Sequence, residues 1–324
     1  MPPCGADAEE APRVSDAELP ALALRSWLFV PGDSERKQDK ALTTDADVVI
    51  LDLEDSVTSA QLPHARERVA HVLRSRGRRQ TPQLWVRVNA PGSGFLKTDL
   101  AEVCAAGALP DGVVLPKVSA ADQIDDVAQY LSTLETGFGR ATGSTRLLVI
   151  ATETAAGLLA LPQYPLTLGA SPLARERLLG LTWGAEDLGA ALGARSRHDA
   201  SGELTFTFQL ARTTCLLAAA ALSVQAIDTV HTNFRDAQGL QRELDNARRD
   251  GFSGKLAIHP DQIAPINAAF APSEGEREHA QRVVAAFAAV SGAGVASLDG
   301  QMIDRPHLLQ AQRILAAARR GGGT

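Results

Sequence analysis

The sequence lacks the features that mark membrane proteins, disulfide-stapled proteins and nucleic-acid-binding proteins. No apolar run reaches the roughly 18 residues that a membrane-spanning helix needs. Only three cysteines occur in 324 residues, widely spaced and without a CxxC pair, so neither a disulfide framework nor a cysteine zinc site is expected. Acidic residues outnumber basic ones by 38 to 32, and the formal net charge of -6 argues against a nucleic-acid or anionic-membrane partner.

The two ends of the chain are the least patterned parts of the sequence. Residues 1–22 lack the basic flank and apolar core of a secretory signal, so we expect a disordered lead-in and a cytoplasmic protein. The final "RRGGGT" is expected to be a frayed tail. The remaining chain is long enough for one large core or for two ordinary ones.

Eight short runs of β-branched and aliphatic residues recur along the chain. They span residues 24–32, 47–55, 84–89, 112–118, 147–154, 178–187, 226–234 and 254–260. Stretches rich in Ala, Leu, Glu, Gln and Arg separate them and predict helices, as at 63–76, 120–135 and 237–250. The runs are almost continuously hydrophobic, as in strands that are covered on both faces. This alternation predicts an α/β fold, a (β/α)8 TIM barrel at residues 23–272, with a doubly wound open sheet as the alternative.

Polar and ionisable residues follow the predicted strands. In such a barrel the chemistry collects where strands end and loops begin, so these groups should converge on one mouth. Burying many charges together is costly unless a cation or an ionic ligand compensates them. The groups are Asp33, Asp52, Glu54, Asp55, Arg87, Asn89, Lys117, Glu153, Glu186, Asp187, Asn233, Asp236 and His259.

A family resemblance covers residues 24 to 272. The segments that carry it are "RSWLFVPGDSERKQDKALTTDADVVILDLEDSV", "WVRVNAPGS", "GVVLPKV", "IATETAAGL", "LTWGAEDLGAALG", "AIDTVHTNFRDAQGL" and "GFSGKLAIHPDQI". They resemble, in order, the signature blocks of the citrate lyase beta-subunit-like family of the HpcH/HpaI aldolase superfamily, which includes malyl-CoA and citramalyl-CoA lyases. A further block at 298–315, "LDGQMIDRPHLLQAQRIL", resembles the C-terminal lid of the CoA lyases, which implies a helical lid at 273–324.

The resemblance implies that Glu153 and Asp187 hold a divalent metal, Mg²⁺ or alternatively Mn²⁺. Two carboxylates without a neighbouring His or Cys cluster suit a hard ion of this kind. Such an ion keeps waters that a 2-keto or 2-hydroxy acid can replace. Taken alone, a carboxylate at a strand end is more often a helix cap or half of a surface ion pair.

Arg87 is similar to the active-site arginine of the family and would hold an enolate or carboxylate oxygen through paired donors. A purely structural pairing with Glu54 or Asp55 is compatible with that role. By resemblance, Asp52, Glu54 and Asp55 orient metal-bound waters and Arg87. Alternation along the second strand would put Asp52 and Glu54 on one side, with Asp55 near the loop.

Asp304 matches the lid aspartate that serves as the acid/base in the family's CoA lyases. The segment "MIDRPHLL" would also suit a helix start, with Asp304 as the N-cap and Pro306 just inside, and both roles can coexist. In the family a neighbouring subunit supplies the lid. We therefore expect a homo-oligomer, a homotrimer or dimer of trimers, in which lids are exchanged.

Five residues are candidates for contacts with the CoA thioester: Arg36, Lys37, Lys117, His259 and Pro260. Lys255 is a further candidate for the CoA phosphates, although surface charge explains these basic residues equally well. A histidine before proline at a strand end is more often structural than catalytic.

The predicted activity is cleavage of a 3-hydroxyacyl-CoA carboxylate to an acyl-CoA and a 2-keto acid, or the reverse condensation. The alternatives are a citrate lyase beta subunit that works with an acyl carrier, a non-CoA 2-keto-3-deoxy acid aldolase and a catalytically silent binding protein. The sequence does not choose between glyoxylate and pyruvate, or between acetyl and propionyl groups, because one methyl in a pocket is worth only about 1–3 kcal/mol.

Overall fold

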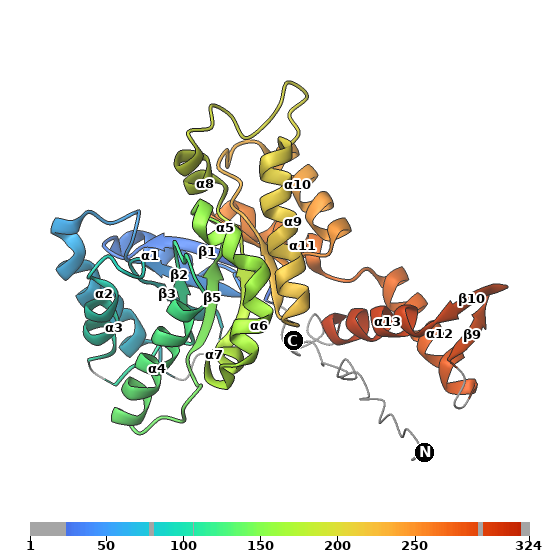
Figure 1. Cartoon of the computed structure of the whole chain (residues 1–324), viewed down its shortest axis with the longest axis horizontal. Helices are drawn as coiled ribbons and strands as arrows, with labels where there is room; N and C mark the ends of the chain where they lie inside the picture. Colours follow the sequence, from blue (N-terminus) through green and yellow to red (C-terminus); the bar gives the residue numbers. More distant parts are fainter. Residues whose placement is uncertain (1–23, 78–80, 106, 291–293, 319–324) are drawn as a thin grey trace, which may run out of the picture.

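Eight parallel strands close into a barrel in which neighbours along the chain are neighbours in the sheet (Figure 1). The computed structural model describes residues 24–77, 81–105, 107–290 and 294–318, so the expected lead-in at 1–22 and the tail "RRGGGT" lie outside these ranges. β1 pairs with β8 as well as with β2, which makes the barrel interpretation correct and the open sheet wrong. The strands are β1 Ser26–Pro31, β2 Val48–Asp52, β3 Gln83–Arg87, β4 Gly112–Leu115, β5 Arg146–Ile150, β6 Leu178–Thr182, β7 Gln225–Asp228 and β8 Gly254–Ala257.

Helices follow the strands and cover the outside of the barrel (Figure 1). The predicted helices at 63–76, 120–135 and 237–250 correspond to α2, α4 and α10. The helices around the barrel are α1 Glu35–Leu42, α2 Leu62–Ser75, α3 Leu96–Cys104, α4 Asp122–Gly137, α5 Ala155–Ala160, α6 Tyr164–Gly169, α7 Pro172–Arg177, α8 Ala185–Leu192, α9 Phe206–Ala221, α10 Ala237–Asp250 and α11 Ile263–Phe270. Short 3₁₀ turns lie at Ser59–Gln61, Leu161–Gln163 and Pro260–Gln262. No helix of the described ranges is both long and apolar enough to cross a membrane.

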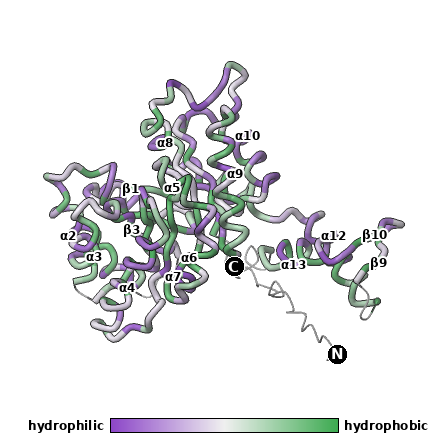
Figure 2. Tube along the Cα trace, viewed as in Figure 1, coloured by the Kyte–Doolittle hydropathy of each residue, from purple (hydrophilic) through white to green (hydrophobic). Residues whose placement is uncertain are grey.

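The barrel interior is a packed apolar core. Alternate residues of each strand point inward, and on β2 these are Val48 and Ile50. Trp27 and Trp85 meet edge to face inside, with ring centroids 4.9 Å apart. A Cβ on Gly112 would lie 2.5 Å from the Trp85 ring, so the glycine makes room for that indole. A second, larger cluster fills the space between the strands and the helices, and the hydrophobic residues concentrate there in Figure 2.

The end of the barrel where the strands begin carries a balanced buried ion pair. Glu135 at the end of α4 and Arg177 at the end of α7 are both fully buried. Glu135 accepts from Arg177 at 2.8 and 2.5 Å, and from the backbone N–H groups of Gly143 at 2.9 Å and Thr145 at 2.7 Å. Arg177 also donates to the Thr145 carbonyl at 2.9 Å and to Ser132 Oγ at 2.8 Å. We call Ser132, Glu135, Thr145 and Arg177 the base cluster.

The C-terminal segment projects from the side of the barrel as a separate unit (Figure 1). It consists of α12 Glu274–Ala289, an antiparallel hairpin of β9 Val295–Leu298 and β10 Gln301–Asp304, and α13 Arg305–Ala318. Five buried residues form its own small core: Ala280, Val283, Ala296, Ile303 and Ala311. The segment is mainly helical, as expected, but the hairpin between its two helices was not predicted. The two-residue turn Asp299-Gly300, with positive φ at both positions, is the sequence signal for a hairpin.

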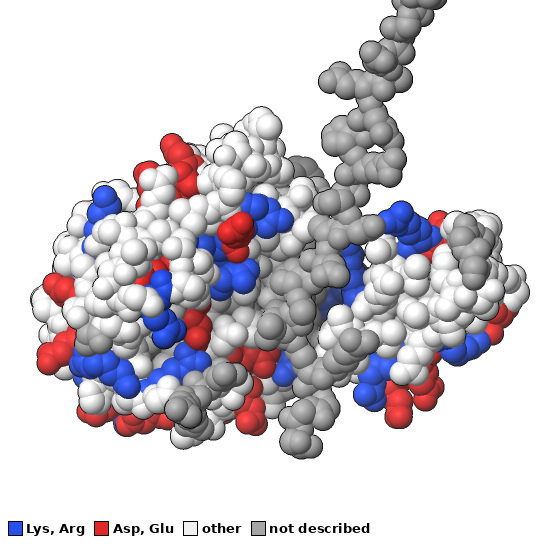
Figure 3. Space-filling view, turned by 90° about the horizontal axis from the view of Figure 1, so that it is seen from below, with Lys and Arg blue, Asp and Glu red and all other residues white. Residues whose placement is uncertain are grey.

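Charges of both signs are interspersed over the face shown in Figure 3. No continuous basic surface is visible on the described part of that face.

Candidate active site

Asp52 and Arg87 stand side by side at the mouth of the barrel, where the strands end. Asp52 continues the inward column of Val48 and Ile50 on β2, so its carboxylate points into the barrel. Arg87 ends β3, and its Cα is the register partner of that of Asp52. The strand pattern therefore places a carboxylate next to a guanidinium above the apolar interior.

Asp52 holds Arg87 in a bidentate ion pair. Arg87 Nε donates to Asp52 Oδ1 at 2.6 Å, and Nη2 donates to Oδ2 at 2.7 Å. The Phe29 ring lies 4.8 Å from the guanidinium carbon and fixes its plane from one side. Burial opposes ionisation of Asp52, but the charge of Arg87 outweighs it and lowers the pKa of that carboxyl. A planar guanidinium is thus held in a single orientation.

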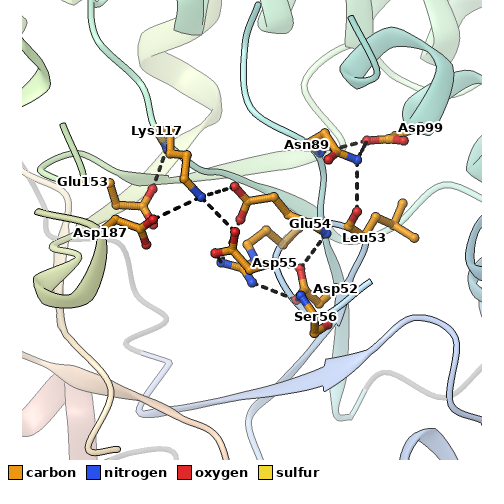
Figure 4. Close-up of polar contacts among 11 residues, drawn as sticks. Asp52, Leu53, Glu54, Asp55, Ser56, Asn89, Asp99, Lys117, Glu153 and Asp187 are labelled. Carbon is orange, nitrogen blue, oxygen red and sulfur yellow. Dashed lines mark hydrogen bonds and ion pairs between the residues drawn. The ribbon is translucent and has the colours of Figure 1, made fainter. Parts of the chain in front are cut away.

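Glu54 and Asp55 also reach Arg87, but from the turn after β2. The strand ends at Asp52, so Glu54 reaches the same side as Asp52 from the turn and not through strand alternation. Arg87 Nη1 lies 3.0 Å from Glu54 Oε2 and 3.3 Å from Asp55 Oδ2. Asn89 anchors the turn by donating to the Leu53 carbonyl at 3.0 Å (Figure 4). Burial raises the pKa of Glu54 to about 7, despite the attraction of Arg87.

Glu153 and Asp187 lie on the other side of the mouth, after β5 and after β6. Glu153 is 3% exposed, and its carboxylate accepts from the backbone N–H of Lys117 at 2.5 Å. A Cβ on Gly184 would lie 2.4 Å from Glu153 Cγ, so only glycine leaves space for this side chain. Burial raises the pKa of Glu153 to about 8, and the nearby negative charge of Asp187 adds to the effect. Two carboxylates so close together are the kind of arrangement that a cation stabilises.

Lys117 lies between the two sides of the mouth (Figure 4). Its ammonium contacts Glu54, lies 3.0 Å from Asp55 Oδ1 and lies 3.3 Å from Asp187 Oδ1. Burial alone would lower the pKa of Lys117, but its hydrogen bond to Glu54 and the surrounding carboxylates raise it. Lys117 was expected to contact CoA. Here its ammonium is engaged by carboxylates, which an isolated motif could not reveal.

The donor set fits a hard divalent cation. Five carboxyl groups face two cationic side chains at this mouth: Asp52, Glu54, Asp55, Glu153 and Asp187 against Arg87 and Lys117. We call these seven residues the mouth cluster. Among the described residues no group of three or more His, Cys, Asp or Glu side chains forms a ready metal cage. Mg²⁺ needs no such cage, because it binds through one or two carboxylates and retains waters. Glu153 and Asp187 could supply that pair.

A pocket of about 710 Å³ opens beside the mouth cluster. Asp52, Asp55, Arg87, Glu153 and Asp187 line one part of it. Arg36, Lys37 and Lys40 of α1 line another part, so the pocket has an acidic region and a basic region. Lys40 was not among the expected residues, although its spacing from Arg36 and Lys37, four and three positions on, puts the three on one helix face.

His259 and Pro260 line the same pocket from the loop after β8. His259 Nδ1 accepts from the Asp261 N–H at 3.2 Å, and the ring stacks on Phe234 with centroids 4.7 Å apart. These contacts give His259 a structural role as a helix cap. Lys255 is different, because it is fully buried and paired with Asp228 and Glu243, each at 2.9 Å. The suggestion that Lys255 contacts CoA phosphates was therefore wrong.

Asp304 is not brought to the mouth of its own barrel. It ends β10, and α13 begins at Arg305 with Pro306 in its first turn, as expected. The residues that line the pocket all come from the barrel part of the described chain. The Asp304 carboxylate instead meets His307 Nδ1 of α13 at 2.5 Å.

A closed parallel barrel with an acidic, pocketed mouth at the strand ends belongs to the class of barrels that carry their sites on the βα loops. Comparison with known proteins places the chain within that class. A sequence model of the HpcH/HpaI aldolase/citrate lyase family matches residues 25–260. The chain belongs to this family, as its resemblance predicted.

Similar proteins cover nearly the whole chain. The citrate lyase subunit beta of Leuconostoc mesenteroides subsp. cremoris is 34% identical, over 91% of this chain and 93% of that protein. A (3S)-malyl-CoA thioesterase of Cereibacter sphaeroides is 36% identical, over 92% of this chain and 95% of that protein. The structure is similar to CitE of Mycobacterium tuberculosis in complex with magnesium, acetoacetate and coenzyme A, with a TM-score of 0.71, 35% identity, and coverage of 93% of this chain and 100% of that chain.

Proposed function

We propose that this protein is a cytoplasmic, Mg²⁺-dependent carbon–carbon lyase that cleaves a 3-hydroxyacyl-CoA carboxylate of the malyl-CoA or citramalyl-CoA type. The observation that carries the proposal is the pairing of Glu153 and Asp187 beside Arg87, in a pocket with a basic edge. Magnesium and coenzyme A are bound together by a structure 35% identical to this chain, which supports both as ligands here. The products would be an acyl-CoA and a 2-keto acid.

Glu153 and Asp187 would hold the metal ion, and the turn after β2 would orient the groups around it. When bound, Mg²⁺ supplies a Lewis acid that chelates the substrate carboxylate and hydroxyl and lowers the hydroxyl pKa. Arg36, Lys37 and Lys40 would meet the phosphates of CoA at the basic edge of the pocket. The acidic region would then receive the carboxylate end and the basic edge the nucleotide end of one substrate.

Arg87 would stabilise the negative charge that develops in the reaction, and Asp304 would transfer a proton to or from the α-carbon. The hydroxyl proton leaves to a base, the carbinol carbon becomes the keto carbon, and the bond to the thioester α-carbon breaks. Its electron pair moves onto the thioester oxygen as an enolate, which Arg87 stabilises through N–H donors held in place by Asp52. Asp304 then protonates the α-carbon, and in the condensation direction it removes that proton.

A neighbouring subunit would supply Asp304. The Asp304 segment has its own core and lies beside its barrel, while the pocket lacks a described lid residue. Exposed apolar residues on α5, α6 and α9 support an interface between copies, within the homotrimer or dimer of trimers that we propose. These residues are Leu159 at 80% exposed, Leu166 at 76%, Phe206 at 75%, Leu210 at 49% and Leu217 at 64%.

Thioester hydrolysis is the second candidate function, because one of the similar proteins is a (3S)-malyl-CoA thioesterase. A citrate lyase beta subunit with an acyl-carrier partner is supported by the similarity to such a subunit. A silent binding protein is disfavoured, because Arg87, Glu153, Asp187 and Asp304 are all present. A non-CoA aldolase is disfavoured because the chain carries the lid segment.

One assay separates the lyase from the thioesterase. The purified protein is incubated with Mg²⁺ and either malyl-CoA or citramalyl-CoA, and the products are identified. A lyase releases acetyl-CoA together with glyoxylate or pyruvate, whereas a thioesterase releases free CoA and the hydroxy diacid. Formation of neither product pair from either thioester would overturn the proposal.

The role of Asp304 has a discriminating substitution. Asn is a good N-cap but cannot exchange a proton, so Asp304→Asn should keep the fold and lower kcat by about 100-fold or more. Mixing Asp304→Asn chains with Glu153→Gln chains should restore activity if lids are exchanged, because some sites then contain neither substitution. An absence of rescue after confirmed subunit exchange would place the lid on its own barrel.

A further inference from the structure

Lys117 combines two unusual features at the mouth. Its φ of 51° lies in the left-handed region, which a side-chain-bearing residue adopts at a cost. This backbone directs its N–H to Glu153 at 2.5 Å, while its ammonium reaches across to Asp187 at 3.3 Å. One residue therefore contacts both carboxylates of the proposed metal pair.

The ammonium of Lys117 is the principal positive charge on that side of the mouth cluster. The guanidinium of Arg87 is paired with the carboxylates of Asp52, Glu54 and Asp55. Lys117 is the residue that links the turn after β2 to Asp187, through Glu54, Asp55 at 3.0 Å and Asp187 at 3.3 Å (Figure 4). It holds together carboxylates that would otherwise repel one another.

We propose that Lys117 is a built-in counter-cation of the metal site, which stabilises the metal-free mouth and lowers the affinity of the site for a divalent cation. The inference rests on the proposed function, in which Glu153 and Asp187 hold the metal. Both cations use Asp187, and an ion at the usual distance of about 2.0–2.1 Å from a carboxylate oxygen would lie within a few ångströms of the ammonium. Two positive charges so close repel, so the ammonium opposes metal binding or withdraws from Asp187.

The alternative is that Lys117 preorganises the ligands and thereby raises the affinity. The geometry favours competition between the ammonium and the metal ion, because the ammonium contacts a carboxylate oxygen of Asp187 directly. The contact with Glu153 is made by the backbone N–H of Lys117 and not by its ammonium. Replacing the side chain leaves that N–H and the left-handed backbone in place. The effect of the ammonium can therefore be measured separately from the effect of the loop.

The experiment measures binding of Mg²⁺ by calorimetry, and of Mn²⁺ by electron paramagnetic resonance, without any substrate. Lys117→Met removes the charge at similar length and should tighten binding by about tenfold or more, a modest part of the repulsion expected between such close charges. Lys117→Arg keeps a charge and should stay within about twofold of wild type. Lys97→Met controls for net charge, because it removes a lysine of α3 that lies over the Tyr130 ring of α4.

A second readout is the unfolding midpoint with and without metal. In EDTA, Lys117→Met should unfold at a lower temperature than wild type, because its carboxylates lose their counter-charge, and added Mg²⁺ should raise its midpoint by more. If Lys117→Met does not fold, Lys117→Gln provides a neutral side chain that still donates hydrogen bonds.

Unchanged or weaker metal binding in the neutral variants would overturn the role proposed for Lys117. That result in a wild-type protein that binds Mg²⁺ and cleaves CoA thioesters would leave the proposed function intact. A wild-type protein that binds Mg²⁺, shows the Lys117 effect and cleaves no thioester would overturn only the proposed function.

Discussion

The two ends of the barrel each bury charged side chains, and they do so in opposite ways. In the base cluster one carboxylate meets one guanidinium, and Glu135 accepts hydrogen bonds from Arg177, Gly143 and Thr145. In the mouth cluster five carboxyl groups share two cations, and burial raises the pKa of Glu153 to about 8. The first arrangement balances one negative charge with one positive charge, whereas the second has a surplus of acid.

The difference separates a structural cluster from a functional one. Buried charges are normally paired, since an unpaired charge costs several kcal/mol. A fold that retains a surplus at one position gives up stability there unless a ligand restores the balance. Substitutions should therefore affect stability at the base and chemistry at the mouth.

The largest expected effect is at the mouth. Glu153→Gln or Asp187→Asn removes one ligand charge at nearly constant volume, so Mg²⁺-dependent turnover should fall by about 1,000-fold or more. The unfolding midpoint in EDTA should stay level or rise, because like charges are relieved. Steady-state kinetics and a thermal melt on the same preparation check both parts. Full activity in EDTA, or a large loss of stability, would contradict the proposed division.

The next effect is at the base. Arg177→Met leaves Glu135 buried without its partner and should lower the free energy of unfolding by about 3–5 kcal/mol. The double variant Arg177→Met with Glu135→Leu removes both charges and should recover most of that loss. Urea unfolding measures each value. The kcat of the folded fraction should be unchanged, and a changed kcat would show that the base cluster also shapes the mouth.

The smallest effect is a pH dependence of the base cluster. Burial opposes ionisation of Glu135, but its hydrogen bonds to Arg177 and to the backbone lower its pKa to about 2. A carboxyl group whose pKa is lower in the folded protein stabilises the fold. Its contribution is complete when the pH is above the unfolded pKa of about 4.5, and it is lost as the pH falls toward 2. The advantage of wild type over Glu135→Gln should therefore shrink by about 3 kcal/mol across that window. A difference that is constant with pH would remove the ion pair as its source.

Patterns along the sequence predicted the barrel well, because each strand is read from its own hydrophobic run. The acidic surplus was also visible, since Asp52, Glu54, Asp55, Glu153 and Asp187 all follow such runs. The order of the runs placed these groups on one mouth, but their roles there stay proposals.

What the sequence could not predict depends on contacts between distant loops. Lys117 has a left-handed backbone that no propensity assigns to lysine, and its ammonium contacts carboxylates on two other segments. The burial of Lys255 depends on Asp228 and Glu243, which lie on other elements. The β9–β10 hairpin is a different case, because the sequence carries a signal for its turn, Asp299-Gly300, inside a segment expected to be helical.

The register between β2 and β3 has a consequence for how the protein matures. Asp52 and Arg87 are neighbours because they are partners in the ladder that also aligns Ile50 with Trp85. A slip of one residue would turn Asp52 toward the helices and bring leucine to the mouth, since neighbouring side chains face opposite ways. A barrel with a misaligned ladder would thus bury a lone acid in its outer apolar layer and fail to persist. Pairing β2 and β3 in register and placing the Asp52–Arg87 pair at the mouth are then a single event.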